Sequence, residues 1–294
     1  MTTSPFPLRR KEDEPFRQKG QRKGMYLLPS LFTTANIAAG YYAISQITQG
    51  SVTEYWHFDN AARAIGVAVV FDALDGFLAR MTRTHSDFGR ELDSLADVIT
   101  FGVAPALLAW FWGFRWLPVM ENADLRTKLI ELGAVFSFVF LMAGASRLAR
   151  FNIQSNPQPS NPGRPGKKYF VGMPIPAGAG VIAAVVHFSA GNPVLTWWLS
   201  AIWLVLMVTS SFLMVSTWRF YSFKEIDWRR RHPFRLIVVV ALLFSGIWFF
   251  SRPVLFFIAM TYMLSGIFWR LMYLWNRRSG STPPRTYTEA PELQ

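Results

Sequence analysis

Four aspartates in the first third of the chain have the spacing of a metal site. Asp72 and Asp75 are three residues apart. Asp93 and Asp97 are four residues apart. On an α-helix either spacing puts both carboxylates on one face. Four carboxylates that converge cannot all stay ionised without cations beside them. Because oxygen-only ligands favour hard ions, the pattern predicts a site for divalent metal such as Mg²⁺, Mn²⁺ or Ca²⁺.

Small residues accompany the aspartates. Gly76 and Ala79 continue the face that carries the first pair, and Gly89 precedes the second pair by four residues. They leave room for a flat or bulky ligand against the helix backbone. Arg80, beside the carboxylates, could neutralise a phosphate group. His85, in the loop between the pairs, is interpreted as a solvated histidine rather than a metal ligand.

The elements that must position these residues are membrane helices. The chain is 51% hydrophobic and 16% charged, whereas about 25% charged residues is usual for a soluble domain. Its apolar runs are close to the ~20 residues that a helix needs to cross a bilayer. The sequence therefore predicts an all-α polytopic membrane protein with about eight transmembrane helices. The expected spans are Leu27–Ile47, Ala61–Met81, Leu92–Phe114, Leu129–Arg147, Pro174–Gly191, Trp197–Val215, Leu236–Ser251 and Pro253–Leu274.

The distribution of Lys and Arg gives the expected orientation. Basic residues gather in the N-terminal tail and after the even-numbered spans, while the loops after spans one and five have none. By the positive-inside rule, both termini and the acidic residues face the cytoplasm. Residues 1–24 are expected to form a disordered basic tail, 25–275 a transmembrane catalytic domain and 276–294 a loose tail. The short connection between spans two and three makes them antiparallel neighbours, so that all four carboxylates can converge.

The net charge of +12 is explained by this topology and by anionic lipid headgroups, so nucleic acid is not an expected partner. The absence of cysteine excludes disulfides and thiolate metal sites. The polar first 24 residues contain no apolar segment typical of a cleaved signal peptide. The expected location is the inner membrane of a bacterium.

The acidic segment matches a family signature, D-x2-D-G-x2-A-R-x8-G-x3-D-x3-D, and the chain resembles the CDP-alcohol phosphatidyltransferase family. Every fixed position of the signature is present. The matching residues are Asp72, Asp75, Gly76, Ala79, Arg80, Gly89, Asp93 and Asp97.

The resemblance implies a role for each residue of the signature. The first three aspartates would ligate two divalent ions, Mg²⁺ or Mn²⁺. Asp97 would complete the metal site and act as general base on the attacking hydroxyl. The small residues would make space for cytidine diphosphate, with Arg80 near its phosphates. The family also implies six core helices and a homodimer, so two of the predicted spans would be additional.

Further motifs narrow the resemblance to the membrane-spanning phosphatidylserine synthases. Pro29, Thr33 and Asn36 fit P-x3-T-x2-N, and segments 95–105, 146–152 and 170–177 are also similar. This likeness implies transfer of a phosphatidyl group from CDP-diacylglycerol, held among membrane lipids, to L-serine. Thr33 and Asn36 could hydrogen-bond the nucleotide, or equally join helices to one another.

Arg147 and Arg150 stand at i and i+3 at the cytoplasmic end of span four, followed by Asn152. They could bind the serine carboxylate or the lipid phosphate. The alternative is that the arginines only satisfy the positive-inside rule and the helix dipole. Lys167 and Lys168 are interpreted as lipid-facing charges.

One alternative is the same reaction with another acceptor, glycerol 3-phosphate, inositol phosphate or choline, and the pattern of residues leaves it open. Functions of other classes leave parts of the pattern unexplained. A transporter or channel would place its acids near the bilayer midplane, but here they lie near one face. A structural scaffold leaves the four aspartates without a purpose.

Overall fold

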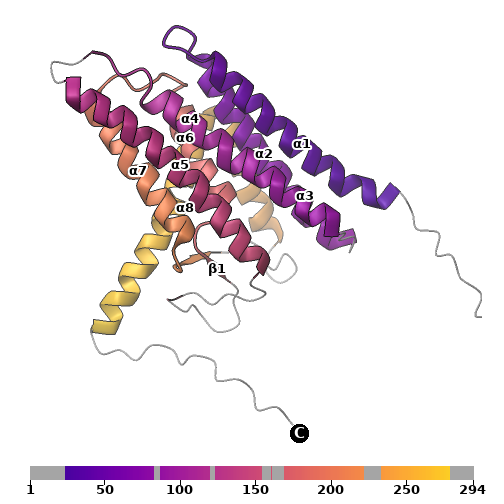
Figure 1. The fold of residues 1–294 in the computed structure, drawn as a ribbon. Helices are drawn as coiled ribbons and strands as arrows, with labels where there is room; N and C mark the ends of the chain where they lie inside the picture. Colours follow the sequence, from indigo (N-terminus) through magenta and orange to yellow (C-terminus); the bar gives the residue numbers. More distant parts are fainter. Residues whose placement is uncertain are drawn as a thin grey trace, which may run out of the picture.

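The computed structural model describes residues 24–82, 87–119, 123–153, 160, 169–221 and 233–278. These residues are mostly helical, with α1 beginning at the right of the view and α8 ending at the lower left (Figure 1). The expected tails lie outside the described residues except where α1 begins and α8 ends, and His85, Lys167 and Lys168 also lie outside them. The elements are α1 Gly24–Gln49, α2 Trp56–Thr82, α3 Asp87–Asp97, η1 Val98–Val103, α4 Ala104–Gly113, α5 Ala123–Ile153, β1 Tyr169–Val171, α6 Ile175–Phe188, α7 Trp197–Val215, β2 Arg219–Tyr221 and α8 Pro233–Arg278.

Four helical stretches of the described chain are long and apolar enough to cross a membrane. They are Gly89–Gly113, Ala123–Ile153, Trp197–Val215 and Ala241–Asn276. The predicted membrane character is therefore supported, whereas the predicted count of eight spans is not confirmed. The fifth predicted span forms α6, which has only 14 residues.

The seventh and eighth predicted spans form one element, α8. Its continuity is broken at Phe250, whose φ of −135° and ψ of 47° are not helical. Pro253 follows three residues later and has no N–H to donate within the helix. Two helical segments therefore meet at a kink here, close to the predicted boundary.

Two features depart from the predicted elements. The third span begins earlier than expected, at Asp87, and is interrupted by the π-helix η1 directly after Asp97. The connections after α5 and α7 contain the strands β1 and β2, which pair antiparallel with Phe170 opposite Phe220. The all-α prediction therefore omitted a small sheet, whose three-residue strands are too short to produce a period-2 pattern.

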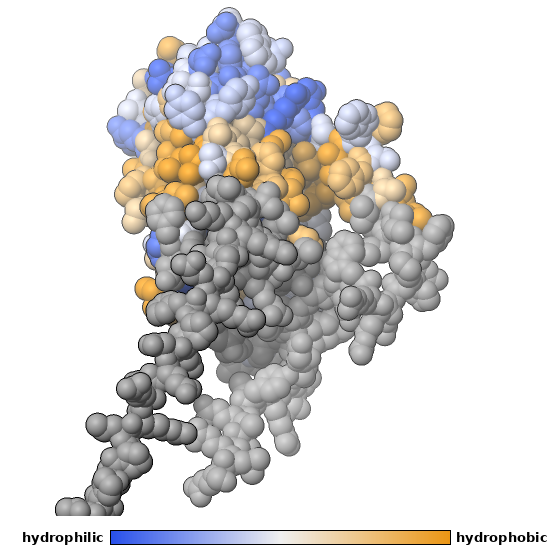
Figure 2. Space-filling model, turned by 90° about the vertical axis from the view of Figure 1, so that its right-hand side faces the viewer, coloured by the Kyte–Doolittle hydropathy of each residue, from blue (hydrophilic) through white to orange (hydrophobic). Residues whose placement is uncertain are grey.

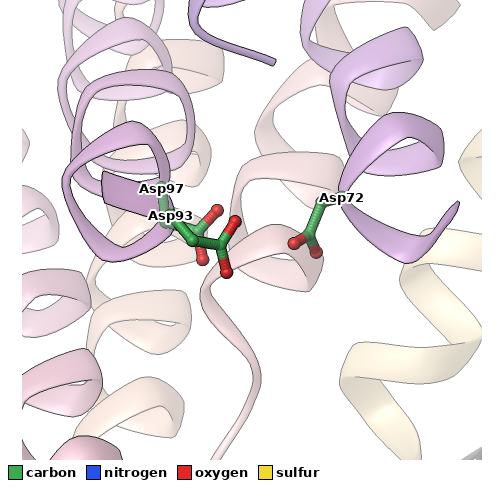
Figure 3. Close-up of side chains that lie close together, drawn as sticks. All are labelled: Asp72, Asp93 and Asp97. Atoms are coloured by element: carbon green, nitrogen blue, oxygen red, sulfur yellow. The ribbon is translucent and has the colours of Figure 1, made fainter. Parts of the chain in front are cut away.

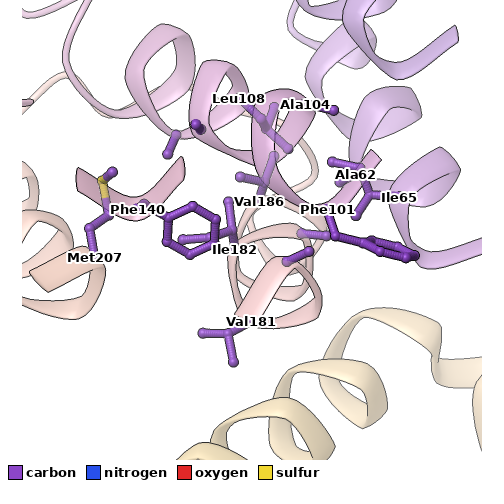
Figure 4. Close-up of a cluster of buried hydrophobic side chains, with 14 of the residues drawn as sticks. Ala62, Ile65, Phe101, Ala104, Leu108, Phe140, Val181, Ile182, Val186 and Met207 are labelled. Carbon is purple, nitrogen blue, oxygen red and sulfur yellow. The ribbon is translucent and has the colours of Figure 1, made fainter. Parts of the chain in front are cut away.

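The core lies where α6 meets η1 and α4 (Figure 4). Phe101 and Leu108 pack with Ile182 and are fully buried. Close packing elsewhere depends on glycine, as expected for helices in a bilayer. A Cβ on Gly40 of α1 would lie 2.4 Å from Thr100 Oγ1 of η1. This contact brings the first helix directly against the π-helix that follows Asp97.

The surface is that of a membrane protein. On the face shown in Figure 2, polar residues gather at one end, with a belt of apolar residues below them. Large apolar side chains are widely exposed, and in α8 Trp248 is 84% exposed. An apolar surface on this scale is compatible with lipid rather than water around it.

Candidate active site

Three of the four predicted aspartates come together between α2 and α3. Asp72, Asp93 and Asp97 each present a carboxylate oxygen within 4.8 Å of the others. Figure 3 shows Asp72 on one side and the other two facing it. Asp72 lies in α2 and the other two in α3, and both of these helices pack against α1. The structure thus contains the predicted acidic cluster, with Asp75 outside this group of three.

Asp75 is buried beside the cluster and is held by α1. Thr33 donates a hydrogen bond from Oγ1 to Asp75 Oδ2 at 2.7 Å. The other oxygen, Oδ1, has no hydrogen-bond partner among the described residues. A buried carboxylate oxygen without a partner is costly, so this atom is suited to an additional cation or donor.

Asp97 is also held by α1. Asn36 Nδ2 lies 3.4 Å from Asp97 Oδ1, and Thr100 Oγ1 donates to the carbonyl oxygen of Asn36 at 3.1 Å. Thr33 and Asn36 therefore join helices through the aspartates, the second of the two roles considered for them. Thr100 was not singled out from the sequence, because its contact depends on the π-helix, which left no recognisable pattern.

The arginines at the end of α5 have different surroundings. Arg147 is only 8% exposed, and its Nε has no hydrogen-bond partner among the described residues. Arg150 instead donates to the carbonyl oxygens of Val215 and Ser216 at the end of α7. The guanidinium of Arg147 lies within electrostatic range of Asp97. Of these two arginines, Arg147 thus keeps a buried N–H without a partner among the described residues, whereas Arg150 is used at the end of α7.

The remaining predicted residues lie around this centre. Asn152 donates to Ser94 Oγ at 3.0 Å, which ties the end of α5 to the aspartate-bearing helix α3. Gly76 in α2 and Gly89 in α3 are half-buried. Ala79 and Arg80 belong to α2, but their side chains lie outside the described part of the structure.

The family model described as CDP-alcohol phosphatidyltransferase matches residues 26–209, which include both pairs of aspartates. The chain belongs to this family. The resemblance deduced from the signature is therefore confirmed. The match includes α1 to α6 and most of α7, while β2 and α8 lie beyond it.

Relatives within the CDP-alcohol phosphatidyltransferase family are named CDP-diacylglycerol–serine O-phosphatidyltransferase. The protein of Helicobacter pylori is 34% identical over 226 residues, which are 75% of this chain and 82% of the relative. That of Bacillus subtilis is 31% identical over 201 residues, 68% of this chain and 93% of the relative. That of Methanocaldococcus jannaschii is 41% identical over 120 residues, 41% and 47% of the two chains.

CDP-alcohol phosphatidyltransferases depend on divalent metal, and the residues present here fit such an ion. Asp72, Asp93 and Asp97 offer only oxygen ligands, which hard divalent cations prefer. The unpartnered Oδ1 of Asp75 adds a further buried oxygen. The cluster could therefore hold the metal on which this family depends.

Proposed function

We propose that this chain transfers the phosphatidyl group of CDP-diacylglycerol to the hydroxyl of L-serine, giving phosphatidylserine and CMP. The observation that carries the chemistry is the convergence of Asp72, Asp93 and Asp97 between two neighbouring helices. The choice of serine is supported by the names of the relatives from H. pylori and B. subtilis, whose matches extend over most of their length.

The four aspartates would hold two divalent ions, Mg²⁺ or Mn²⁺, with Ca²⁺ as a further candidate. When bound, such ions would neutralise the diphosphate and stabilise the charge that develops during phosphoryl transfer. Thr33 and Asn36 would keep Asp75 and Asp97 in position by the hydrogen bonds that α1 supplies. These two residues would thus support the metal ligands instead of binding the nucleotide, which revises their expected role.

Asp97 would accept the proton of the serine hydroxyl. The serine oxygen would form a bond with the phosphorus that carries diacylglycerol, and the bond from that phosphorus to the CMP oxygen would break. Arg147 would bind the serine carboxylate, because it is a buried cation with an unused N–H close to Asp97. Gly76, Ala79, Gly89 and Arg80 would form the pocket for cytidine diphosphate.

In the membrane, the two segments of α8 would supply the seventh and eighth of eight spans, with six helices forming the catalytic core. Both termini and the carboxylates would face the cytoplasm, at the inner membrane of a bacterium. This orientation is supported by the basic residues of alternate loops. The family likeness further suggests a homodimer.

The deciding experiment is an acceptor assay with the purified protein and CDP-diacylglycerol. We expect CMP release with L-serine and much slower release with glycerol 3-phosphate, inositol phosphate or choline. EDTA should abolish the reaction, and excess Mg²⁺ or Mn²⁺ should restore it. Faster reaction with another acceptor would overturn the assignment of serine, and no CMP release with any acceptor would overturn the enzyme assignment.

A further inference from the structure

A second polar cluster lies at the end of the helices opposite the carboxylates. Asp59 stands near the start of α2 and Asp72 well along it, so that about 20 Å of helix separates them at the α-helical rise per residue. His187 belongs to the last turn of α6, and Ser251 lies at the kink of α8. The reaction proposed above uses none of Asp59, His187 and Ser251.

These three side chains are hydrogen-bonded in series. The Oγ of Ser251 lies 3.0 Å from His187 Nε2, and His187 Nδ1 lies 2.5 Å from Asp59 Oδ1. The other carboxylate oxygen of Asp59 forms an ion pair with Arg63 at 2.7 Å. A carboxylate in an ion pair only accepts hydrogen bonds, so Nδ1 carries the imidazole proton. Nε2 is then an acceptor that faces the hydroxyl of Ser251.

Close packing holds the backbone around this cluster. Gly191, which follows α6, has a φ of 79°, and an added Cβ there would lie 2.4 Å from the carbonyl oxygen of Tyr55, just before α2. Phe188, next to His187, stacks on Phe256 of α8 with the ring centroids 4.6 Å apart. The end of α6 is therefore fixed against both of the helices whose side chains it joins.

Ser251 differs from its two partners in accessibility. Asp59 and His187 are each 5% exposed, whereas Ser251 is only half-buried. Ser251 directly follows Phe250, whose backbone is not helical, so a new helical segment begins here. The start of a helix supplies N–H groups that can bind an oxyanion. The hydroxyl is thus reachable, while the imidazole and the carboxylate behind it are shielded from water.

The order of these contacts is that of a nucleophilic serine with its general base. In serine hydrolases a carboxylate orients the imidazole through Nδ1–H, and Nε2 takes the proton of the hydroxyl. This arrangement is defined by geometry and occurs on unrelated folds. We propose that Ser251, His187 and Asp59 form a second catalytic site, which hydrolyses carboxylic esters of lipids at the membrane face opposite the phosphatidyl transfer site.

The surroundings of Ser251 favour an ester that resides in the bilayer. Trp248, Phe249 and Phe250 precede it and are 84%, 74% and 66% exposed. An apolar surface of this kind is suited to acyl chains rather than to water. In the proposed topology the kink joins the seventh and eighth spans, so Ser251 lies where a membrane helix ends. The ester groups of a glycerolipid lie at this depth, between its acyl chains and its headgroup.

The reaction has two steps. Ser251 Oγ attacks the carbonyl carbon of the ester while its proton passes to His187 Nε2, and the alcohol leaves with that proton. Water then attacks the carbonyl carbon of the acyl-serine and gives a proton to Nε2, which returns it to Ser251 Oγ as the acyl–oxygen bond breaks. The products are an alcohol and a carboxylic acid, and both side chains return to their starting states.

The test is the reaction of the purified full-length protein with a fluorophosphonate, which forms a covalent adduct with activated serines. Mass spectrometry should locate the adduct on Ser251 of the unaltered protein, and this protein should hydrolyse p-nitrophenyl hexanoate. EDTA should change neither result, although it should abolish phosphatidyl transfer. His187→Gln should slow labelling and hydrolysis by about 10²–10⁴-fold, the contribution of a general base.

Two further variants complete the test. Ser265→Ala is the matched control, because Ser265 also lies in α8 but donates to the carbonyl oxygen of Tyr262. It should leave labelling and hydrolysis within about twofold. Asp59→Asn keeps the shape of the side chain and should slow both reactions as His187→Gln does, so it provides the comparison where His187→Gln fails to fold.

The contrary results are equally definite. Absence of an adduct from the unaltered protein would show that the three side chains only hold α8 against α6, and would overturn the proposal. An adduct on another residue, labelling without hydrolysis of the ester, or unchanged labelling in His187→Gln would overturn it as well. The location of the adduct is measured on the unaltered protein and does not depend on the folding of any variant.

Discussion

Thr33 of α1 donates a hydrogen bond to Asp75 of α2 at 2.7 Å, and the other carboxylate oxygen of Asp75 has no hydrogen-bond partner among the described residues. The first helix thus holds a carboxylate that the signature places on the second. Hydrogen bonds of this kind orient metal ligands and are worth about 10–100-fold in metal affinity or activity. The P-x3-T-x2-N segment therefore belongs to the support of the proposed metal centre.

Replacing Thr33 by Val should lower the apparent affinity for Mg²⁺ or Mn²⁺ by about 10–100-fold. Val has a similar shape but cannot donate to Asp75. The rate at saturating metal should recover to within a few-fold of normal, since the metal ligands themselves are intact. The measurement is a metal titration of CMP release. Thr34→Val is the matched control because Thr34 is exposed, and an unchanged titration for Thr33→Val would contradict the supporting role.

Gly40→Ala should disturb the site through η1. The new Cβ would lie 2.4 Å from Thr100 Oγ1, and Thr100 in turn bonds to the carbonyl of Asn36. Overpacking of this kind costs about 1–3 kcal/mol. We expect a lower unfolding temperature in detergent and reduced turnover, because Asn36 and Asp97 are displaced together.

Gly66→Ala is the control for this substitution. Gly66 is also within a helix, and a Cβ there would have no atom within 4 Å. It should leave stability and turnover near those of the unaltered chain. Equal effects of the two substitutions would indicate that the loss comes from glycine in general and not from the contact with Thr100.

Much of the fold could be predicted because membrane helices have a strong signal. The predicted span Trp197–Val215 coincides with α7, and the acidic pairs could be assigned to neighbouring helices from their spacing alone. The π-helix after Asp97 could not be predicted, since its hydrogen-bond register depends on packing against α1 and not on residue types. The hydrogen bond from Thr33 to Asp75 depends on how α1 and α2 cross, and residue spacing in the sequence does not describe that crossing.

The acceptor side was harder to predict for a physical reason. The i and i+3 spacing of Arg147 and Arg150 gives no reason to distinguish them. In the structure Arg147 is buried, whereas Arg150, one turn later, lies against the end of α7. Arg150 is used by the carbonyl oxygens of Val215 and Ser216.

Substitution should separate the two arginines. Arg147→Gln should raise KM for L-serine by about 10–150-fold, the range for a lost hydrogen bond to a charged group. Arg150→Gln should leave that KM within about twofold and lower the unfolding temperature, because it loses bonds to the end of α7. Serine kinetics and thermal unfolding in detergent check both. A large serine effect in Arg150→Gln would return Arg150 to the acceptor pocket.

Asp97→Asn tests the proposed base. Asparagine keeps the shape of the side chain but cannot accept the serine proton, and general base catalysis is worth about 10²–10⁴-fold. We therefore expect kcat to fall by that amount and to stay low at any concentration of Mn²⁺.

Asp72→Asn is the matched variant, since Asp72 belongs to the same cluster and has no proposed part in proton transfer. Its activity should rise as Mn²⁺ is increased, because its defect is weaker metal binding. If excess Mn²⁺ restored Asp97→Asn as fully as Asp72→Asn, Asp97 would be a metal ligand alone and the proton would have to go to another group.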